Sequence, residues 1–356
     1  MRDLKVMRIS AASQCRRDAM RAVGYRQSQP IIAETSLIDL DLPEPKAAGR
    51  DLLVEVKAVS VNPVDTKIRV RSQPAEGEAS VLGWDAAGIV RAVGPKVTGF
   101  RPGDAVFYAG AIDRPGSNAE FHLVDERIVG PKPKSLGFAE AAALPLTAIT
   151  AWEMLFDRLD IRRPVPGAAH ALLIIGGAGG VGSIAIQLAR RLSDVAVIAT
   201  ASRPETRLWA QELGAHHVID HTKPLADQVA ALGIGAPAFV FSTTHTDTHL
   251  EGIVELMAPQ GRFGLIDDPK VLDANPLKRK SLSLHWELMF TRSLFKTADM
   301  GEQGKLLAEV SRLVDADQIR TTLAEHFGTI SAANLKRAHA LIESNRAKGK
   351  IVLEGF

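Results

Sequence analysis

A glycine-rich turn carries the strongest chemical signal in this sequence. The residues Gly177-Ala-Gly179-Gly-Val-Gly182 fit the pattern G-x-G-x-x-G, directly after the apolar run 171–175 and before an amphipathic segment. The first glycine permits a tight turn, the second lets the backbone approach a pyrophosphate, and the third lets helix and strand pack closely. The amino end of the helix supplies unpaired N–H groups for the anion. The pattern predicts a dinucleotide site, with a turn that binds no ligand as the alternative; its contacts would come from Gly177, Gly179, Gly180, Val181 and Gly182.

The end of the following strand indicates which dinucleotide binds. A fold that selects NAD places Asp or Glu there, about 20 residues beyond the loop, to bind the ribose 2′-hydroxyl. Here the strand runs into Ser202 and Arg203, and Glu205 fits a capping-box partner of Ser202 just inside the next helix. A unit charge pair at ~4 Å is worth about 4 kcal/mol at an effective dielectric of ~20, so Arg203 would attract a 2′-phosphate. The sequence favours NADP(H) bound by Ser202 and Arg203, with a solvated loop arginine as the alternative.

Alternating strands and helices must position this loop. Alternation of this kind predicts an α/β fold with a doubly wound parallel sheet, covered by helices on both faces. We expect strands near 171–175, 195–200, 217–220, 238–242, 262–266 and 281–286, and helices near 180–192, 204–213, 224–231 and 247–258. Further helices are expected near 301–315 and 331–345, before a last strand at 350–353.

The part of the chain before this alternation has a different pattern. From about residue 20 to 135 short apolar stretches are punctuated by Gly-Pro pairs, which predicts a β-rich, partly open barrel. Helical composition begins at residue 138 and is interrupted by Pro145. Residues 1–19 carry five basic and two acidic side chains but no apolar core suited to a signal peptide. We expect them to be a disordered N-terminal extension, with a transit peptide as the alternative.

Composition excludes several classes of partner and compartment. The 356 residues include 43 Lys plus Arg and 41 Asp plus Glu, so charge gives no reason to expect nucleic acid or an anionic membrane as partner. The run 168–189 is free of charge and long enough to cross a bilayer, but its glycines predict strand, turn and helix. The single cysteine, Cys15, cannot form an intramolecular disulfide, which favours a reducing, cytoplasmic location.

Four segments resemble the medium-chain dehydrogenase/reductase superfamily: Val61-Asn-Pro-Val-Asp-Thr-Lys67, Leu82-Gly-Trp-Asp-Ala-Ala-Gly-Ile-Val90, the glycine loop, and Leu213-Gly-Ala-His-His-Val-Ile-Asp220. The first and third are similar to the quinone oxidoreductase (zeta-crystallin-like) branch. The stretch 286–293 with 299–300 looks like a subgroup labelled zinc-type alcohol dehydrogenase-like. The resemblance implies a GroES-like catalytic domain (20–145), a Rossmann NADP-binding domain (146–288) and a C-terminal segment (289–356) that returns to the first domain. It also implies a homodimer joined around 281–286.

The residues contradict the zinc in that label. Zinc alcohol dehydrogenases hold the catalytic ion with a Cys in C-x-x-D and a His in G-H-E-x-x-G. In this sequence Asn62 and Trp84 stand at those two positions. A structural zinc site needs four closely spaced cysteines, whereas this chain has only Cys15. We therefore expect no zinc.

Without a metal, the protein must place NADPH against an acceptor and stabilise the negative charge that arrives with the hydride. Electron-poor acceptors such as quinones and α,β-unsaturated carbonyls suit this chemistry better than simple ketones. Asn62 is the candidate donor to substrate or cofactor, and Asp65 the residue that orders its loop. Lys67 could supply positive charge to a developing enolate, and Trp84 could form a stacking wall. Ordinary turn, surface or core roles are the alternatives for these four residues.

The resemblance adds three residues to the expected cofactor site. Thr147 corresponds to the helix start that faces the nicotinamide, and Ser242 follows the strand whose backbone lines the nicotinamide ribose. Lys350 belongs to a C-terminal basic cluster that can reach the cofactor phosphates. The expected function is zinc-independent, NADPH-dependent reduction of a small-molecule quinone or enone. The alternatives are an enoyl-thioester reductase, or an NADPH-binding sensor or structural protein with little turnover.

Overall fold

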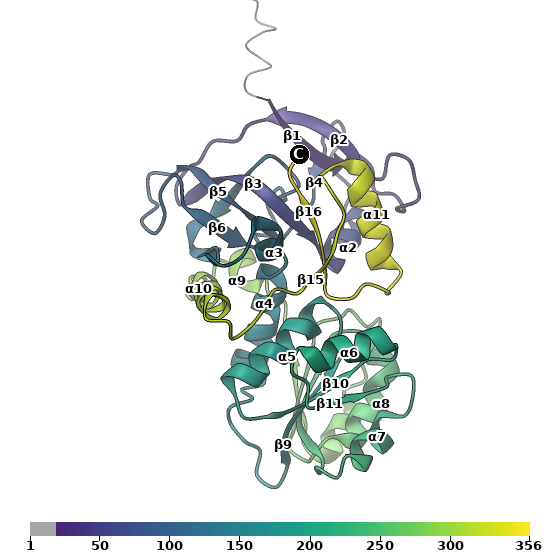
Figure 1. Ribbon diagram of the computed structural model, residues 1–356. Coiled ribbons are helices and arrows are strands. Elements are labelled where there is room, and N and C mark those ends of the chain that lie inside the picture. The colour runs from purple at the N-terminus through teal and green to yellow at the C-terminus, as the bar shows by residue number, and fades with distance from the viewer. Residues whose placement is uncertain (1–18) are drawn as a thin grey trace, which may run out of the picture.

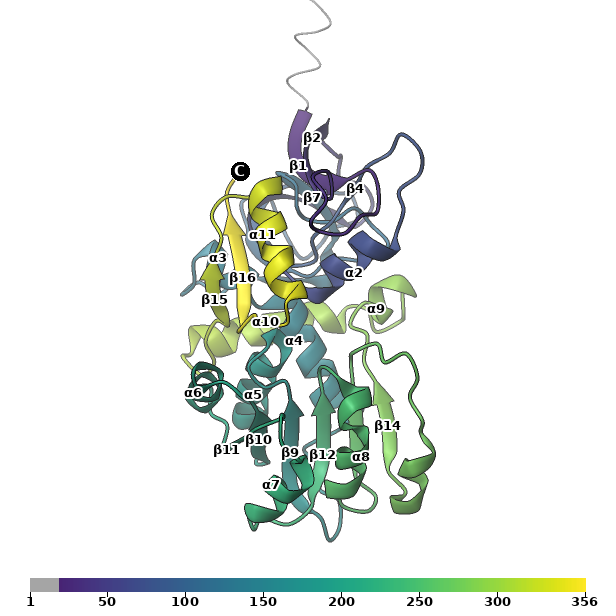
Figure 2. The same cartoon turned by 90° about the vertical axis from the view of Figure 1, so that its right-hand side faces the viewer.

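Two bodies built on β-sheets lie one above the other in the computed structural model, which describes residues 19–356 (Figure 1). The lower body in that view holds a parallel sheet, and the upper body holds mainly antiparallel strands. Helices α4 (Pro145–Trp152), α9 (Thr291–Leu294) and α10 (Glu302–Asp315) lie between the two bodies (Figures 1 and 2). The expected N-terminal extension and Cys15 lie outside the described residues, except for Ala19.

The parallel sheet has the doubly wound form that the alternating pattern predicts. Its strand order is β11-β10-β9-β12-β13-β14, so the order reverses beside β9, where such sheets bind ligands at the carboxyl ends of their strands. Each expected element is present within two residues of its predicted limits. The strands are β9 (Ala169–Ile175), β10 (Ala196–Thr200), β11 (His217–Ile219), β12 (Pro237–Ser242), β13 (Arg262–Leu265) and β14 (Ser283–Trp286). The helices are α5 (Gly180–Leu192), α6 (Pro204–Glu212), α7 (Leu225–Ala231) and α8 (Thr246–Leu256).

The upper body confirms the β-rich pattern of the first third of the chain. A seven-stranded sheet in the order β15-β16-β3-β5-β6-β8, with β7 also paired to β3, packs near a three-stranded sheet, β2-β1-β4. The strands of the first third are β1 (Ala19–Tyr25), β2 (Ile38–Pro43), β3 (Asp51–Val61), β4 (Ser80–Val81), β5 (Ala86–Val93), β6 (Ala105–Tyr108), β7 (Phe121–Asp125) and β8 (Val129–Pro131). Helix α3 (Phe138–Ala142) leads from this body to α4.

The end of the chain pairs with its beginning. Strand β16 (Lys350–Glu354) runs antiparallel to β3, with Val352 opposite Ser60, and parallel to β15 (Leu323–His326). Helix α11 (Ala332–Glu343) packs against the same body (Figure 2). This pairing brings Lys350 next to residues almost 300 positions earlier in the chain.

One helix of the upper body was not among the expected elements. Helix α2 (Pro63–Arg71) begins directly after Asn62, with Pro63 in its first turn. Its buried positions are Asp65, Thr66 and Arg69, so the side of the helix that faces the protein is polar. A search for apolar residues at helical spacing cannot find such a helix. In residues 19–356 the structure contains no helix long and apolar enough to span a membrane.

Candidate active site

The glycine loop lies between the end of β9 and the start of α5, as the motif predicts. A Cβ atom on Gly177 would come within 2.7 Å of the Ala199 Cβ, and one on Gly182 within 2.3 Å of the Gly176 carbonyl oxygen. Packing inside the protein therefore requires these two glycines. A Cβ on Gly179 would meet, among the described residues, only the Gly176 oxygen at 3.4 Å. The space beside Gly179 thus fits the close approach of a pyrophosphate, and helix α5 presents its amino end there.

The turn after β10 has the predicted residues but a different cap. Helix α6 begins at Pro204, so Arg203 rather than Ser202 occupies the position before the helix. The Arg203 N–H donates to the Thr206 hydroxyl at 3.2 Å, whereas Glu205 pairs with the Arg203 guanidinium at 2.9 Å. The expected capping box between Ser202 and Glu205 is wrong, because Pro204 takes the first helical position and shifts the register by one residue. Arg203 also donates to the Arg346 carbonyl oxygen at 3.0 Å and keeps about a third of its side chain exposed.

A buried ion pair joins the beginning and the end of the upper body. The Lys350 ammonium lies 3.0 Å from the Asp85 carboxylate, and both side chains are almost fully buried. Lys350 also donates to the Val61 carbonyl oxygen at 3.1 Å and to the Asn62 side-chain oxygen. The Asn62 amide nitrogen donates to Asp85 at 3.0 Å, which closes the cluster. The second Asp85 oxygen accepts from the Leu146 N–H at 2.9 Å, at the start of α4.

These contacts change the roles expected of Asn62 and Lys350. Lys350 donates to Val61 and Asn62, and its ammonium also pairs with the Asp85 carboxylate at 3.0 Å, so a group with three hydrogens has three partners within the protein. In this arrangement the Lys350 ammonium is committed to protein groups rather than free for a cofactor phosphate. The Asn62 amide is also occupied on both its oxygen and its nitrogen, and the residue is 1% exposed. The geometry therefore supports a positioning role for both residues rather than direct contact with a ligand.

Asp65 lies next to this cluster, in the first turn of helix α2. One of its oxygens accepts from the Asn62 N–H at 2.6 Å, a contact that suits the loop-ordering role expected of it. The other oxygen is buried without a hydrogen-bond partner in the described part of the chain. Burial raises the pKa of Asp65 to about 7; repulsion from Asp85 adds to this, while the Asn62 N–H and Lys350 act against it. Burial likewise raises the pKa of Asp85, although Lys350 opposes the change.

The remaining predicted residues lie around this cluster with their polar atoms occupied. Trp84 is 3% exposed, donates its indole N–H to the Ala111 carbonyl oxygen at 3.1 Å and meets the Phe290 ring edge-on. The buried Thr147 donates to the Leu144 carbonyl oxygen at 3.1 Å, and its methyl group would lie 3.2 Å from a Cβ on Gly180. Thr147 thus does lie against the glycine loop.

Ser242 and Lys67 lie outside the cluster. The Ser242 hydroxyl is buried and lies 2.7 Å from the Thr246 hydroxyl at the start of α8. Lys67 is partly exposed and forms an ion pair with Asp268, in the loop that follows β13. The structure therefore brings Asn62, Asp65 and Lys350 together, and places Lys67 at the boundary between the two bodies.

Sequence reasoning missed two carboxylates in this region. Asp85 stands directly after Trp84 in a recognised motif, so its position at a strand start could have identified it. Asp268 offered no comparable signal, because its partners Lys67 and Arg71 lie about 200 positions earlier in the chain.

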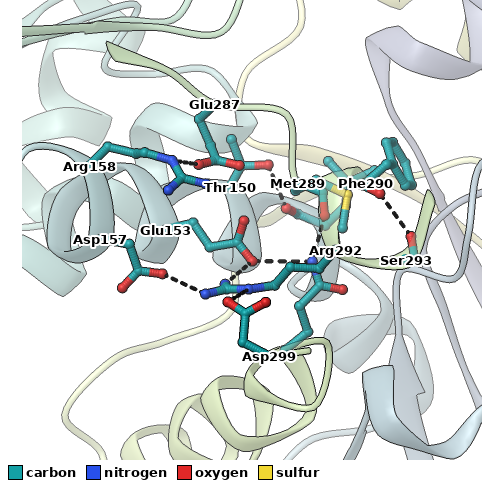
Figure 3. A network of polar contacts seen from close by, with 12 residues as sticks. Thr150, Glu153, Asp157, Arg158, Glu287, Met289, Phe290, Arg292, Ser293 and Asp299 are labelled. Carbon is teal, nitrogen blue, oxygen red and sulfur yellow. Dashed lines mark hydrogen bonds and ion pairs between the residues drawn. The ribbon is translucent and has the colours of Figure 1, made fainter. Parts of the chain in front are cut away.

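A second polar network lies at the far end of α4, where the chain continues as a π-helical turn, Glu153–Arg158 (Figure 3). Glu153 and Glu287 are both buried, and Glu287 follows β14 directly. Arg292 contacts Glu153 at 2.6 Å, and Arg158 contacts Glu287 at 2.8 Å. Burial and then repulsion from Glu153 raise the pKa of Glu287 to about 8. Asp157 and Asp299 complete the charges around Arg292, and Gln303 donates to Glu153.

The residues at the expected metal positions do not fit zinc. The Asn62 oxygen accepts from a cation that belongs to the protein itself, the Lys350 ammonium. The Trp84 nitrogen is a donor only and is used on Ala111. Across residues 19–356, no group of three or more His, Cys, Asp or Glu side chains could hold a metal ion. The thiolate and imidazole donors typical of a zinc site are thus replaced by an amide and an indole.

Comparison with known proteins identifies the family. Residues 48–150 match the model of the alcohol dehydrogenase GroES-like domain, and residues 213–353 match that of the zinc-binding dehydrogenases. A zinc-type alcohol dehydrogenase-like protein of Staphylococcus aureus (strain MSSA476) is 40% identical over 312 residues, which cover 87% of this chain and 92% of that protein. The chain belongs to the medium-chain dehydrogenase/reductase superfamily.

Two further relatives agree with this membership. A crystal structure from Rhizobium etli CFN 42, described provisionally as a zinc-dependent alcohol dehydrogenase, is 66% identical and has a TM-score of 0.94, covering 95% of this chain and 98% of the other. A quinone oxidoreductase of Pseudomonas aeruginosa is 32% identical over 85% of this chain and 91% of that protein. Members of this superfamily are oxidoreductases, and the glycine loop of this chain fits the nucleotide cofactor that the fold supports.

Proposed function

We propose that this medium-chain dehydrogenase/reductase is a zinc-independent enzyme that transfers hydride from NADPH to a quinone or an α,β-unsaturated carbonyl. The observation that carries the proposal is the buried cluster of Asn62, Asp85 and Lys350. In this cluster the Asn62 amide, which stands where the resemblance would place a zinc-binding cysteine, accepts from an ammonium of the protein itself. With no Lewis acid to polarise a simple ketone, acceptors that are already electron-poor suit this site best.

The choice of NADPH is supported by the turn after β10. Arg203 lies beyond the end of that strand, and its partly exposed guanidinium could meet a 2′-phosphate. Glu205 already pairs with this guanidinium, so it would compete with the phosphate for the same cation. Arg203 has five N–H donors and the two contacts described above use only part of them, which supports a shared role.

When bound, NADPH would supply the hydride, and the residues of this chain would position and shield it. The glycine loop and the start of α5 would hold the pyrophosphate. Thr147, packed against Gly180, would face the reactive ring of the cofactor, as the resemblance implies. Trp84 and Phe290 meet edge-on at the side of this region and would exclude water from it.

We also propose a homodimer in the cytoplasm. Among the described residues β14 pairs with β13 alone, so its other edge carries free backbone donors and acceptors. Trp286 at the end of this strand and Leu288 and Phe295 after it are 51%, 52% and 71% exposed, so large apolar side chains follow this edge strand at the surface. A second copy of this chain, bound through the same strand, would cover both the free edge of β14 and the exposed apolar side chains. Sedimentation of wild type and Trp286→Glu tests the dimer, which the charge should dissociate, and a monomeric wild type would contradict it.

The function is tested by the initial rate of NADPH consumption with an ortho-quinone and with a free enone, on full-length protein treated with EDTA. We expect turnover that prefers NADPH over NADH and survives EDTA. The same assay with an acyl-thioester enone addresses the nearest alternative enzyme. Faster turnover of the thioester would reassign the substrate class. NADPH binding without turnover of any acceptor would contradict the proposal and favour a sensor.

Loss of activity on EDTA treatment, restored by zinc, would contradict the zinc-independent mechanism. Zinc content measured on the purified protein is the matched control. We expect less than about one-tenth of an equivalent per chain, because the donor set around Asn62 and Trp84 lacks thiolate and imidazole.

A further inference from the structure

The segment before β16 contacts the glycine loop directly. The Gly349 N–H donates to the Ala178 carbonyl oxygen at 2.9 Å, inside the loop itself. A Cβ on Gly180 would lie 3.0 Å from the Lys350 side chain and 3.6 Å from the Gly349 carbonyl oxygen. The aliphatic part of Lys350 therefore runs along the first turn of α5, where the proposed cofactor would place its pyrophosphate.

The charged end of the same side chain lies in the other body. The Lys350 ammonium is bound by Val61, Asn62 and Asp85, and the residue is 2% exposed. Asn62 immediately precedes helix α2, and Asp85 accepts from the first turn of α4. A single side chain thus contacts the loop of the lower body with its methylenes and the start of α2 with its ammonium.

Helix α2 is fixed to the upper body at its first turn and at Arg69. The Arg69 guanidinium is fully buried, forms an ion pair with Glu343 on α11, and donates to the Gln29 carbonyl oxygen. Asp65 accepts from Asn62 at the first turn of the same helix. A shift of Lys350 would therefore be passed to Asn62 and to the whole of α2 rather than absorbed by a loose turn.

We propose that Lys350 is a positioning residue that holds the glycine loop in register with Asn62 and Asp85, so that a cofactor bound at the loop orders the start of helix α2. Only the effect of a bound cofactor on helix α2 rests on the proposed binding of NADPH. The positioning role differs from a phosphate contact because the ammonium already has three partners within the protein, Val61, Asn62 and Asp85. It also explains why a lysine is buried at this position, where an apolar side chain of similar length would fill the same space.

The test uses amide hydrogen exchange of the full-length chain, with and without saturating NADPH. The variants are Lys350→Met and the double variant Lys350→Met with Asp85→Asn, which leaves no unpaired buried charge if the single change impairs folding. Lys305→Met, an exposed lysine on α10, is the matched control. Peptides from α7 report on global unfolding, because that helix packs mainly against α8 and β11 in the lower body.

Without cofactor, the variants should exchange at least about tenfold faster than wild type at both 176–180 and 61–66, with α7 unchanged. With NADPH, wild type should gain protection at the loop and at 61–66 together, whereas the double variant should gain it at the loop alone. Unchanged exchange at the loop and at 61–66 in the cofactor-free variants would overturn the proposal. Equal acceleration at α7 would also overturn it, since the lysine would then serve only global stability.

The affinity for NADPH distinguishes the positioning role of Lys350 from direct contact with a cofactor phosphate. If Lys350 contacted a phosphate, Lys350→Met would raise the NADPH dissociation constant tenfold or more and reduce its salt dependence. The positioning role predicts a change of less than about threefold in that constant, with a larger fall in turnover. A wild type that shows no protection by NADPH at the loop would contradict the proposed function. The cofactor-free comparison would still decide the role of Lys350.

Discussion

The Lys67 ammonium lies 3.1 Å from the Asp268 carboxylate, and this contact joins helix α2 of the upper body to the loop after β13 of the lower one. Arg71, one turn further along α2, contacts the same carboxylate at 3.1 Å. The three side chains are between about one-third and two-thirds exposed, so the pairs are screened by solvent. They connect the two bodies at the side where strands β9 and β13 end, which is the side of the proposed cofactor.

Asp268→Asn should weaken the closed arrangement of the two bodies. Exposed pairs contribute roughly 0.2–1 kcal/mol each, so we expect NADPH to dissociate about two to five times faster at low salt. The difference should vanish near 1 M salt, where the Debye length is about 3 Å. Stopped-flow displacement of NADPH across a salt series measures this. Asp41→Asn, on the exposed face of β2, is the control, and a difference that persists at high salt would refute the electrostatic explanation.

Two glycines of the loop should respond differently to alanine. Gly182→Ala places a methyl group against the backbone at Gly176, which should cost about 1–3 kcal/mol of unfolding free energy. Gly179 has φ −73°, and a Cβ there would make an ordinary contact at 3.4 Å with the Gly176 carbonyl oxygen, so Gly179→Ala should change that free energy by less than about 0.5 kcal/mol. It should nevertheless raise the NADPH dissociation constant at least about tenfold, because the new methyl group occupies the pyrophosphate position. Thermal unfolding and fluorescence titration measure the two effects, and unimpaired NADPH binding by Gly179→Ala would locate the pyrophosphate elsewhere.

Cofactor selectivity should depend on two neighbouring charges. A hydrogen bond to a charged group contributes about 1.5–3 kcal/mol, so Arg203→Ala should raise the NADPH dissociation constant about 10- to 100-fold. NADH affinity should stay within about twofold. Glu205→Gln should act in the opposite direction and tighten NADPH, because it frees the Arg203 guanidinium. Parallel titrations with both nucleotides decide this, and equal losses for NADPH and NADH would show that Arg203 supports the loop instead.

The stability of the protein should fall with rising pH through the ionisation of Glu287. The folded state holds the pKa of Glu287 above its usual value of 4.5, so between pH 4.5 and about 8 it binds more protons than the unfolded chain. The stabilising effect of this proton is complete below pH 4.5 and is lost as the pH rises through the folded pKa. One proton corresponds to about 1.4 kcal/mol per pH unit, and Glu287→Gln should reduce the slope by up to that amount.

Denaturant titrations at pH 5, 6, 7 and 8 measure the slope. Glu302→Gln is the control, since that carboxylate is half-exposed in an ion pair with Lys305 at 2.7 Å. If wild type and Glu287→Gln had identical slopes, Glu287 would not be the group that binds the extra proton in the folded state.

The lower body could be predicted from sequence almost completely, because its signals are local. Apolar runs such as 171–175 and the helical spacing after Gly182 define each element within a few neighbouring residues. Parallel pairing then follows, since the central strands β9, β10 and β12 are largely buried and helices connect successive strands. Arg203 follows β10 and Thr147 packs against Gly180, as expected from distance along the chain and from resemblance, while their roles toward a cofactor stay predictions.

The site in the upper body could be predicted only as a set of residues. The sequence indicated that Asn62 and Asp65 lie in one loop. It did not predict helix α2, which begins there, because the buried side of that helix is polar. It assigned Lys350 to a cofactor phosphate because the basic residues near the end of the chain resemble a cluster that can reach the phosphates. The partner of Lys350 depends on the antiparallel register between β16 and β3, which no local pattern encodes.

The amino-acid sequence by itself determined the parallel sheet, the glycine loop and the types of donor near it, because each depends on residues within one turn or one strand. The tertiary structure alone decided that Lys350 pairs with Asp85, that the Asn62 side-chain oxygen accepts from Lys350, and that Lys67 pairs with Asp268. These contacts join residues about 200 to 290 positions apart. Burial then fixes their charges, since an ammonium and a carboxylate can leave water together only when the fold brings them into contact.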